Sequence, residues 1–526
     1  MRGIIGAGPR WGGDAFSRLV GPLRHFAPRV APIIAPMFLR RLFLIALCCA
    51  CNWAQAQIPA AVDAELARAK VPQDAVSLLV LDANNPSAPP RLAHRAGMPM
   101  KAASVMKLVT TYAALDLLGP AYTWATPVFV EGRVRAGVLS GNVYIQGQGD
   151  PKLVLERLWL LLRRLQGIGI ARIQGDIVLD NSAFEVVAND PGAFDGEPLR
   201  PYNANPDALL INYKSVLMTF TPDAARRIAY VQFDPPLWGV QTQDTVALQS
   251  GPCGDYRAAL KAALADPARI AFAGAYPADC GEKIWPLAYA DPASYAPRAV
   301  QGLWRSMGGA LSGTVRYGQV PAALLAAPPA LEVRSAPLAE IVRDINKYSN
   351  NVMAQQVFLT LGRDASGSVG TLAASRAVLL RWWQERIAHK TGTAAEAATD
   401  ASTNASMEPL NFDNGSGLSR QERISARALG QLLQSAYRSP LMPELMASLP
   451  ISGVDGTLKR AKFAKPGSAH LKTGSLNEVT AIAGFVHGAS GKRYVLVALA
   501  NHPNAHAARA AFDALVNWTA QDSEDH

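Results

Sequence analysis

The sequence predicts an α/β fold of the α+β type, in which two outer segments with strands and helices flank a β-rich insert. Residues 57–125 contain an apolar run followed by a helical repeat. Residues 126–330 contain short apolar runs separated by Gly, Pro and Asp, the pattern of strands and turns. Helical repeats then return, and the chain ends in a hairpin pattern and a last helix. We therefore expect one domain formed by 57–125 and 331–526, split by an insert of 126–330.

The first outer segment predicts one strand and one helix. The run VSLLVLDANNP at 76–86 is apolar until a turn cluster ends it, which indicates a buried strand. The stretch SVMKLVTTYAALDLLGP at 104–120 has apolar residues at helical spacing and is closed by Gly-Pro. Position 104 therefore lies in the first turn of the expected helix.

The second outer segment predicts helices first and a hairpin later. An Ala/Thr/Ser-rich loop is expected at 388–408. Apolar runs at 481–486 and 493–501 on either side of the turn GASG predict the hairpin. The remaining helices are expected at 155–165 within the insert and at 338–362, 375–387 and 507–520 after it.

The composition argues against a disordered chain and gives no sign of a nucleic-acid surface. Of the 526 residues, 49% are hydrophobic and 17% are charged, which suits two or three domains with cores. The formal net charge is +10, but the seven Arg and one acid of residues 1–56 account for +6 of it. Because the other residues hold only +4 and no run of Lys or Arg, we expect no nucleic-acid partner.

Residues 1–56 have the pattern of an export signal. Arg40-Arg41 precede the apolar run LFLIALCCAC, and Ala54-Gln55-Ala56 follows as a small-x-small cleavage site. Met37, just before this signal, is the expected true start, with cleavage after Ala56. The ten-residue run is too short for a stable transmembrane helix. We therefore expect a periplasmic protein with at most peripheral membrane association.

Two cysteines remain after such a cleavage, Cys253 and Cys280. In an exported protein the pair favours a structural disulfide, with two free thiols as the alternative. The sequence has no HExxH, CxxC, GxGxxG, P-loop or GxSxG pattern. It therefore predicts no metal and no cofactor, and gives no support to a hydrolase based on a Ser-His-Asp triad.

A serine and a lysine stand three residues apart at the start of the expected helix. Ser104-Val105-Met106-Lys107 is the single Ser-x-x-Lys of the chain. Residues at i and i+3 share a helix face, and burial disfavours the charged form of a lysine. A neutral lysine beside a serine makes a nucleophile with its base. The alternative interpretation is an ordinary helix start at the surface.

Ser-x-Asn occurs four times, so position must distinguish the copies. Ser349-Asn350-Asn351 lies within an expected helix, between apolar residues that could hold it in a cleft. Of the other copies, at 140–142, 402–404 and 475–477, the first has the pattern of a turn and the second lies in the low-complexity loop. We therefore expect the copy at 349–351 to be functional.

Lys-Thr-Gly occurs twice, at 390–392 and at 472–474. Lys390 enters the Ala/Thr-rich loop with no strand after it, which favours a solvated loop. Lys472 is followed by the hairpin, and a strand there would hold Thr473 and its backbone rigidly. It also follows the chosen Ser-x-Asn, as the order of motifs in penicillin-recognising enzymes requires.

With these motifs in order, the chain resembles the D-alanyl-D-alanine carboxypeptidase/endopeptidases, the class C low-molecular-mass penicillin-binding proteins of the penicillin-binding protein 4 type. The resemblance extends over about 98–486. It implies a transpeptidase/β-lactamase-like domain of antiparallel sheet flanked by helices, split by a large insert. The segments that carry it are MKAASVMKLVTTYAAL, GQGDPKL, KYSNNVMAQQVF, DNGSGLSR, SGVDGTLKR and HLKTGSLNEVTAIAGFV.

The resemblance also implies a role for each motif residue. Ser104 is the expected nucleophile, Lys107 its base and Ser349 the proton relay to the leaving D-alanine. Asn351 is expected to orient Lys107 and contact the substrate amide. Lys472 and Thr473 are expected to bind the terminal carboxylate of the substrate. Gly474 and Ser475 follow in the same run, and the N–H groups of Ser475 and Ser104 are expected to bind the oxyanion. DNGSGLSR is expected to shape a loop beside the site, and Asp150 of GQGDPKL a turn.

The implied activity is hydrolysis of peptidoglycan stem peptides through an acyl-enzyme, as a D-Ala-D-Ala carboxypeptidase, a D,D-endopeptidase or both. β-Lactams are the expected covalent inhibitors. One alternative is a serine β-lactamase, which shares Ser104 and Lys107 but must hydrolyse its acyl-enzyme quickly. The other is a wall-binding module without catalysis, against which the intact set of motifs argues.

Overall fold

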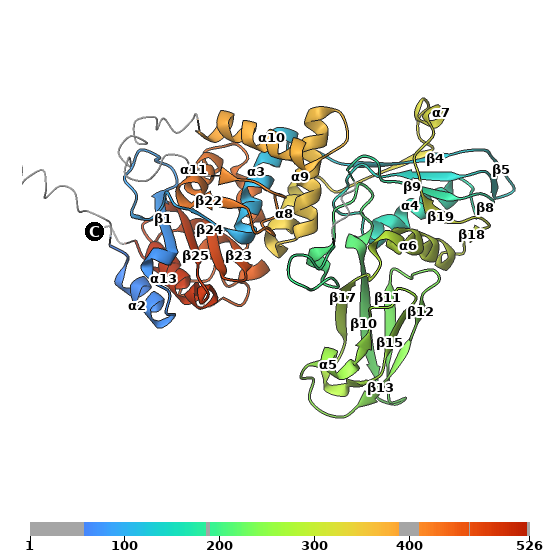
Figure 1. The fold of residues 1–526 in the computed structure, drawn as a ribbon, viewed down its shortest axis with the longest axis horizontal. Coiled ribbons are helices and arrows are strands. Elements are labelled where there is room, and N and C mark those ends of the chain that lie inside the picture. Colours follow the sequence, from blue (N-terminus) through green and yellow to red (C-terminus); the bar gives the residue numbers. More distant parts are fainter. Residues whose placement is uncertain (1–56, 186–189, 389–409, 462, 523–526) are drawn as a thin grey trace, which may run out of the picture. The chain divides into compact units, whose positions relative to one another are not determined.

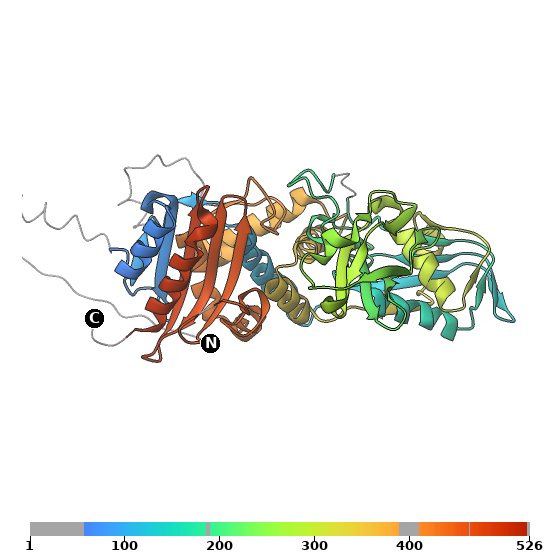
Figure 2. The same ribbon diagram turned by 90° about the horizontal axis from the view of Figure 1, so that it is seen from below.

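The computed structural model describes residues 57–185, 190–388, 410–461 and 463–522. The first and last parts of this range share one antiparallel sheet, in the order β2-β1-β25-β24-β23 (Figures 1 and 2). The fold is therefore mixed α/β, with the C-terminal hairpin at the centre of the sheet. Its strands are β1 (Val76–Asp82), β2 (Leu92–His94), β23 (Ala469–Leu476), β24 (Val479–His487) and β25 (Arg493–Asn501).

Helices cover both faces of this sheet, because its central strands are apolar on both sides. Val495 and Val497 of β25 face one core, while Leu496 and Ala498 face the other, as the two-residue period of a strand requires. One face packs against α2 (Ala60–Arg68) and α13 (Arg509–Ala520). The other packs against α3 (Lys107–Leu118), α8 (Leu338–Tyr348), α9 (Asn351–Ser366), α10 (Leu372–Trp383), α11 (Ala426–Tyr437) and α12 (Met442–Ser448).

A small three-stranded sheet adjoins this second layer. Its order is β21-β22-β3, so it joins a strand just before the 3₁₀ turn of Ser104 to two strands late in the chain. The strands are β3 (Pro99–Met100), β21 (Leu410–Asn411) and β22 (Arg423–Ser425).

Between α3 and α8 the chain forms four further sheets within the described residues. Two of them enclose a core with α4 (Leu155–Gly167) and α6 (Pro292–Ser306). Their orders are β19-β9-β7-β4-β20 and β18-β8-β6-β5. The strands are β4 (Ala125–Val130), β5 (Arg133–Arg135), β6 (Val138–Ser140), β7 (Val143–Gln146), β8 (Arg172–Ile173), β9 (Ile177–Asp180), β18 (Ala310–Leu311), β19 (Val315–Tyr317) and β20 (Leu331–Arg334); α7 (Ala322–Leu325) precedes β20.

The other two sheets have a core of their own, rich in aromatic residues. Their orders are β16-β13-β11-β10-β17 and β12-β15-β14. Cys253 and Cys280 lie at this core and are joined in a disulfide. The elements are β10 (Ser215–Asp223), β11 (Ile228–Asp234), β12 (Gln241–Thr242), β13 (Thr245–Gln249), α5 (Tyr256–Leu260), β14 (Ala262–Ala263), β15 (Arg269–Phe272), β16 (Ala275–Pro277) and β17 (Lys283–Ala288).

Across the part of the chain that the structure describes, no helix combines the length and the apolar character needed to cross a bilayer. Asp150 lies in a turn after β7, as the sequence predicts, where its Oδ1 accepts the N–H of Lys152 at 2.8 Å. The turn is buried, and burial raises the pKa of the Asp150 carboxyl to about 6.

Candidate active site

Ser104 and Lys107 are in contact at the N-terminal end of α3. Ser104 lies in a 3₁₀ turn, Ala103–Met106, that leads directly into the helix. The Nζ atom of Lys107 lies 2.8 Å from the Oγ atom of Ser104. Ala103, just before the serine, has a φ of 47°, a left-handed backbone that residues other than glycine rarely adopt. The structure therefore brings together the two residues that the sequence pairs.

Two of the three neighbours of Lys107 can only accept hydrogen bonds. Its Nζ donates to the Oδ1 atom of Asn351 at 2.6 Å and to the backbone carbonyl of Ser416 at 2.5 Å. An ammonium ion has three N–H donors, whereas a neutral amine has two donors and one lone pair. If Lys107 is neutral, the two carbonyl oxygens take both of its donors, and its lone pair then faces the hydroxyl of Ser104. This geometry suits a base that removes the proton of Ser104.

Burial and a nearby cation lower the pKa of Lys107 well below its ordinary value. The side chain is fully buried, and the loss of solvation is the largest cause. The positive charge of Lys472 lowers this pKa further, while the charge of Glu422 opposes the shift. Burial also lowers the pKa of Lys472, to about 7. Both lysines therefore lose a proton far more easily than an exposed lysine does.

Ser349 and Asn351 lie where the sequence predicts one continuous helix over 338–362, and that prediction is wrong. Ser349 ends α8 with a φ of 57°, and a new helix begins at Asn351. Asn350 caps the new helix by accepting an N–H of its first turn at 3.0 Å. Because apolar residues continue across the break, their spacing does not reveal it. At the break the Oγ atom of Ser349 accepts a hydrogen bond from the Nζ atom of Lys472 at 2.9 Å.

The chosen Lys-Thr-Gly lies on β23, which is an edge strand of the five-stranded sheet. The side chain of Lys472 is fully buried, and its Nζ also donates to the backbone carbonyl of Thr473 at 2.7 Å. The hydroxyl of Thr473 lies 2.8 Å from the hydroxyl of Thr457. Lys472 and a pair of hydroxyl groups thus lie at the same edge of the sheet.

Gly474 allows the backbone of β23 to approach Ser104. A Cβ atom at position 474 would lie 2.6 Å from the carbonyl oxygen of Ala102 and 3.1 Å from the backbone N of Ser104. The first of these distances is too short for any side chain, so the approach requires glycine. Ser475 follows on the same strand, and its hydroxyl lies 3.3 Å from the Nδ1 atom of His506. The strand therefore runs beside the N–H of Ser104.

The segment DNGSGLSR supplies a backbone acceptor that the sequence did not identify. The carbonyl of Ser416 within it binds Lys107. The buried carboxylate of Glu422 holds this loop, because its Oε1 accepts three consecutive backbone N–H groups, of residues 413, 414 and 415, at 3.0–3.2 Å. Burial raises the pKa of Glu422. A backbone carbonyl has no residue-type signal, so a motif search cannot find this role.

A loop that precedes β10 also reaches the candidate site. The Nδ2 atom of Asn351 donates to the carbonyl of Tyr202 at 3.2 Å, which leaves the Oδ1 atom of the same amide for the lysine. Arg420 donates to the carbonyl of Phe194 at 2.6 Å. The resulting cleft has a volume of about 700 Å³. Its lining residues are Lys101, Ser104, Phe194, Asp195, Tyr202, Tyr348, Ser349, Asn351, Leu418, Ser419, Arg420, Ser475, Leu476, Asn477 and Val479.

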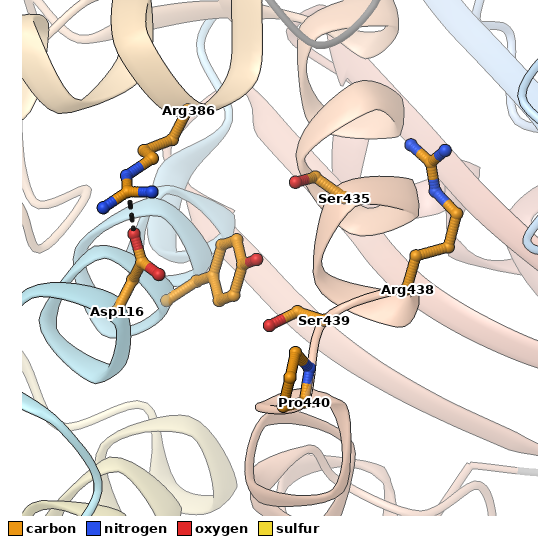
Figure 3. A pocket seen from close by; sticks show the side chains of 7 residues that line it. Asp116, Arg386, Ser435, Arg438, Ser439 and Pro440 are labelled. Carbon is orange, nitrogen blue, oxygen red and sulfur yellow. Dashed lines mark ion pairs between the residues drawn. The ribbon is translucent and has the colours of Figure 1, made fainter. Parts of the chain in front are cut away.

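A second cavity, of about 430 Å³, is lined by residues other than these (Figure 3). Arg386 lies there with its Nε atom 3.6 Å from the Oδ2 atom of Asp116, and this oxygen also accepts the indole N–H of Trp382 at 2.8 Å. Figure 3 shows Ser435 and Ser439 on the opposite side of the cavity from this ion pair. Neither serine has a lysine within hydrogen-bonding distance in the described contacts. We therefore assign this cavity no catalytic role.

Three features predicted from the sequence lie outside the described residues, apart from Ala388. They are the export signal of residues 1–56, the loop expected at 388–408, and the second Lys-Thr-Gly, at Lys390, within that loop.

Comparison with known proteins gives a family match over most of the chain. The model of the D-Ala-D-Ala carboxypeptidase 3 (S13) family matches residues 58–522. The D-alanyl-D-alanine carboxypeptidase of Actinomadura sp. (strain R39) is 29% identical over 412 residues, which cover 75% of this chain and 72% of the relative. The D-alanyl-D-alanine carboxypeptidase DacB of Haemophilus influenzae is 26% identical over 412 residues, or 76% of this chain and 80% of that protein.

The fold also matches a solved structure. The crystal structure of penicillin binding protein 4 (dacB) from Haemophilus influenzae superposes with a TM-score of 0.65 at 22% identity. The match covers 86% of this chain and 99% of that one. A second structure of the same protein, complexed with a novel β-lactam, gives a TM-score of 0.61 at 21% identity. The fold class predicted from the sequence is therefore confirmed.

Proposed function

Because the chain belongs to the D-Ala-D-Ala carboxypeptidase 3 (S13) family, and is thus a serine peptidase of that class, we propose that the cleft around Ser104 is its active site. The observation that carries this assignment is the contact of 2.8 Å between Ser104 Oγ and the buried Nζ of Lys107. Lys107 meets the two requirements of a base, a lowered pKa and a free lone pair directed at the nucleophile.

Acylation follows from this arrangement. The Oγ atom of Ser104 attacks the carbonyl carbon of the penultimate D-alanine, and its proton passes to Lys107. The N–H groups of Ser104 and Ser475 stabilise the oxyanion, since Gly474 brings the two backbones together. When the C–N bond breaks, the hydroxyl of Ser349 gives its proton to the leaving amine and takes in return the proton that Lys107 received from Ser104. Water then hydrolyses the acyl-enzyme and releases the shortened peptide.

Lys472 and Thr473 bind the terminal carboxylate of the substrate. The ammonium of Lys472 is buried at the edge of the cleft and touches only neutral oxygens, so an incoming carboxylate finds an unpaired cation. The same groups would hold the carboxylate of a β-lactam, whose strained amide acylates Ser104. The β-lactam complex of the Haemophilus influenzae protein supports this inhibitor class.

The physiological substrates would be the stem peptides of peptidoglycan, cleaved by carboxypeptidase action, by endopeptidase action on cross-links, or by both. Such a substrate lies outside the cytoplasm. We therefore propose that residues 1–56 direct export to the periplasm and that cleavage follows Ala56. The disulfide between Cys253 and Cys280 is consistent with an oxidising compartment.

Labelling with fluorescent penicillin tests the assignment of the nucleophile. We expect the wild-type enzyme to form a stable adduct and to release D-alanine from a D-Ala-D-Ala peptide, and Ser104→Ala to do neither. Ser435→Ala, a serine at the second cavity, is the matched control and should label normally. An adduct in Ser104→Ala would refute the assignment. Fast nitrocefin hydrolysis without D-alanine release would instead identify a β-lactamase.

A further inference from the structure

A cavity far in sequence from the catalytic motifs lies between α4, α6 and the end of β11, elements that Figure 1 labels. Its volume is about 540 Å³, which is in the range of small-molecule sites. Glu156 and Trp159 come from α4, Phe233 and Asp234 from β11, and Ser306 from α6. Most of the wall is apolar, and two carboxylates and a hydroxyl are its polar groups.

Trp159 is not explained by the packing of its helix. The buried face of α4 consists of leucines, at 158, 161, 162 and 165, which fill the adjacent core. Trp159 lies outside that face and is 46% exposed. A single exposed apolar ring is common, but Trp159 joins Leu155, Phe233 and Leu303 in one apolar wall, and a continuous apolar surface of this kind is informative. The indole of Trp159 offers a flat face to a ligand.

The two carboxylates of the cavity have unused capacity to accept hydrogen bonds. The Oδ2 atom of Asp234 accepts from the side chain of Gln232 at 2.8 Å. Glu156 accepts no hydrogen bond and forms no ion pair among the contacts of the described residues. Burial raises the pKa of Asp234, and the nearby charge of Glu156 adds to this shift. The cavity thus disfavours an anion and calls for a ligand with hydrogen-bond donors.

The chemistry of this cavity fits a sugar ring. The C–H face of a pyranose stacks on an aromatic side chain, and its hydroxyl and amide groups donate to carboxylates. A purely apolar ligand would leave the carboxylates without donors, at a cost in desolvation. An isolated ammonium ion would satisfy them but would leave the apolar wall uncovered.

We propose that this cavity is a saccharide subsite, which binds an N-acetylhexosamine unit of the peptidoglycan glycan strand. The identity of the glycan rests on the proposed function, because that function makes peptidoglycan the substrate. The subsite holds the polymer while the cleft acts on its stem peptides. It therefore raises the affinity for polymeric substrate and has no part in the chemical step.

Calorimetric titration with an N-acetylglucosamine tetramer tests the subsite without reference to peptidase activity. We expect the wild-type protein to bind and Trp159→Ala to bind at least about tenfold more weakly, the size of effect that one aromatic contact can have. Leu160→Ala is the matched control, because Leu160 is 42% exposed on the same helix but does not line the cavity. Glu156→Gln should also weaken binding of the tetramer. This variant changes an exposed position and, unlike Trp159→Ala, leaves the apolar wall intact.

Kinetics separate this proposal from the proposed function. For Trp159→Ala we expect a raised KM on polymeric peptidoglycan, with unchanged kinetics on a soluble D-Ala-D-Ala peptide and unchanged penicillin acylation. The saccharide subsite is refuted if the wild type hydrolyses the soluble peptide but does not bind the tetramer. It is also refuted if the protein binds only the cationic glucosamine tetramer. Tetramer binding without peptidase activity would refute the proposed function alone.

Discussion

The proposed active site at Ser104 and the cavity of Figure 3 both include basic side chains, but the partners of these side chains differ between the two regions. Beside the cleft, Lys107 and Lys472 are fully buried, and the atoms that they contact are hydroxyl and carbonyl oxygens. In the other cavity, Arg386 is about half exposed and faces the carboxylate of Asp116. Of these three side chains, the two buried lysines therefore have no carboxylate partner, whereas the half-exposed Arg386 has one.

This difference indicates which region does chemistry. A buried cation without a carboxylate destabilises the fold, and it responds by a lowered pKa. A fold keeps such a group only where a neutral amine or an unpaired ammonium is needed. An exposed arginine that is paired with a carboxylate changes the free energy of unfolding only slightly. Volume alone could not distinguish the two regions, whereas the pairing of charge does.

Replacement of Lys107 by methionine should give the largest effect. Without a base, we expect kcat/KM for a D-Ala-D-Ala peptide to fall by about 10⁴-fold, the upper range for general base catalysis. The melting temperature should not fall, because an apolar side chain replaces a desolvated amine of similar length. Stopped-flow acylation by penicillin and thermal unfolding provide the two measurements. Fast acylation of Lys107→Met would show that Lys107 is not the base. The buried, unpaired lysines would then not distinguish the proposed active site from the second cavity.

Lys472→Met should weaken acylation by about 10²-fold, through the loss of an electrostatic contact to the substrate carboxylate. Its matched control is Lys390→Met, in the other copy of Lys-Thr-Gly, which should label as the wild type does. Esterification of the substrate carboxylate should abolish the difference between Lys472→Met and the wild type. If Lys390→Met is the impaired variant instead, the choice between the two copies is wrong.

The titration of Lys472 should change stability and acylation in opposite directions as the pH rises. Its folded pKa of about 7 lies below the ordinary value of 10.5, so between these values the unfolded chain binds more protons than the folded one. Stability must then rise with pH above about 7, and Lys107 acts in the same direction. Acylation should fall over the same range, because Lys472 loses the charge that binds the carboxylate. Urea unfolding between about pH 7 and 10.5, and acylation rates from about one pH unit below the folded pKa upward, would show the opposite slopes.

Lys472→Met supplies the control for that profile. It should remove the fall in acylation, and it should reduce the pH dependence of stability to the part that Lys107 contributes. A wild-type enzyme whose stability is constant across this range of pH would contradict the lowered pKa of Lys472.

How much of the site could be predicted depended on whether a side chain or the backbone carries each role. The sequence identified the family, which is confirmed. It also selected motif residues that the structure brings into contact, such as Lys107 with Ser104 and Lys472 with Ser349, because their spacing is a side-chain pattern. It missed the carbonyls of Ser416 and Tyr202, since any residue could supply them. It also missed the break at Ser349, where one apolar face runs through two helices.

In the fold, too, features specified by a local sequence pattern were predictable and features without such a pattern were not. The apolar runs of β24 and β25 on either side of the turn GASG predict the hairpin, because each strand is specified by its own sequence. The pairing of β1 with β25 joins residues more than 400 positions apart, and no local pattern specifies such a partner. The roles assigned to the cleft residues stay predictions until variants are measured.

The smallest expected effect is that of Arg386→Met in the second cavity. Because the arginine is about half exposed, loss of its ion pair with Asp116 should lower the free energy of unfolding by only about 0.5 kcal/mol, and less at high salt. Urea unfolding at low and high ionic strength measures this, and a cycle with Asp116→Asn isolates the pair. Penicillin acylation should not change. A slower acylation in Arg386→Met would mean that α3 couples the two regions, because this helix carries Asp116 and begins at Lys107. The second cavity would then also influence acylation, only less strongly than the cleft.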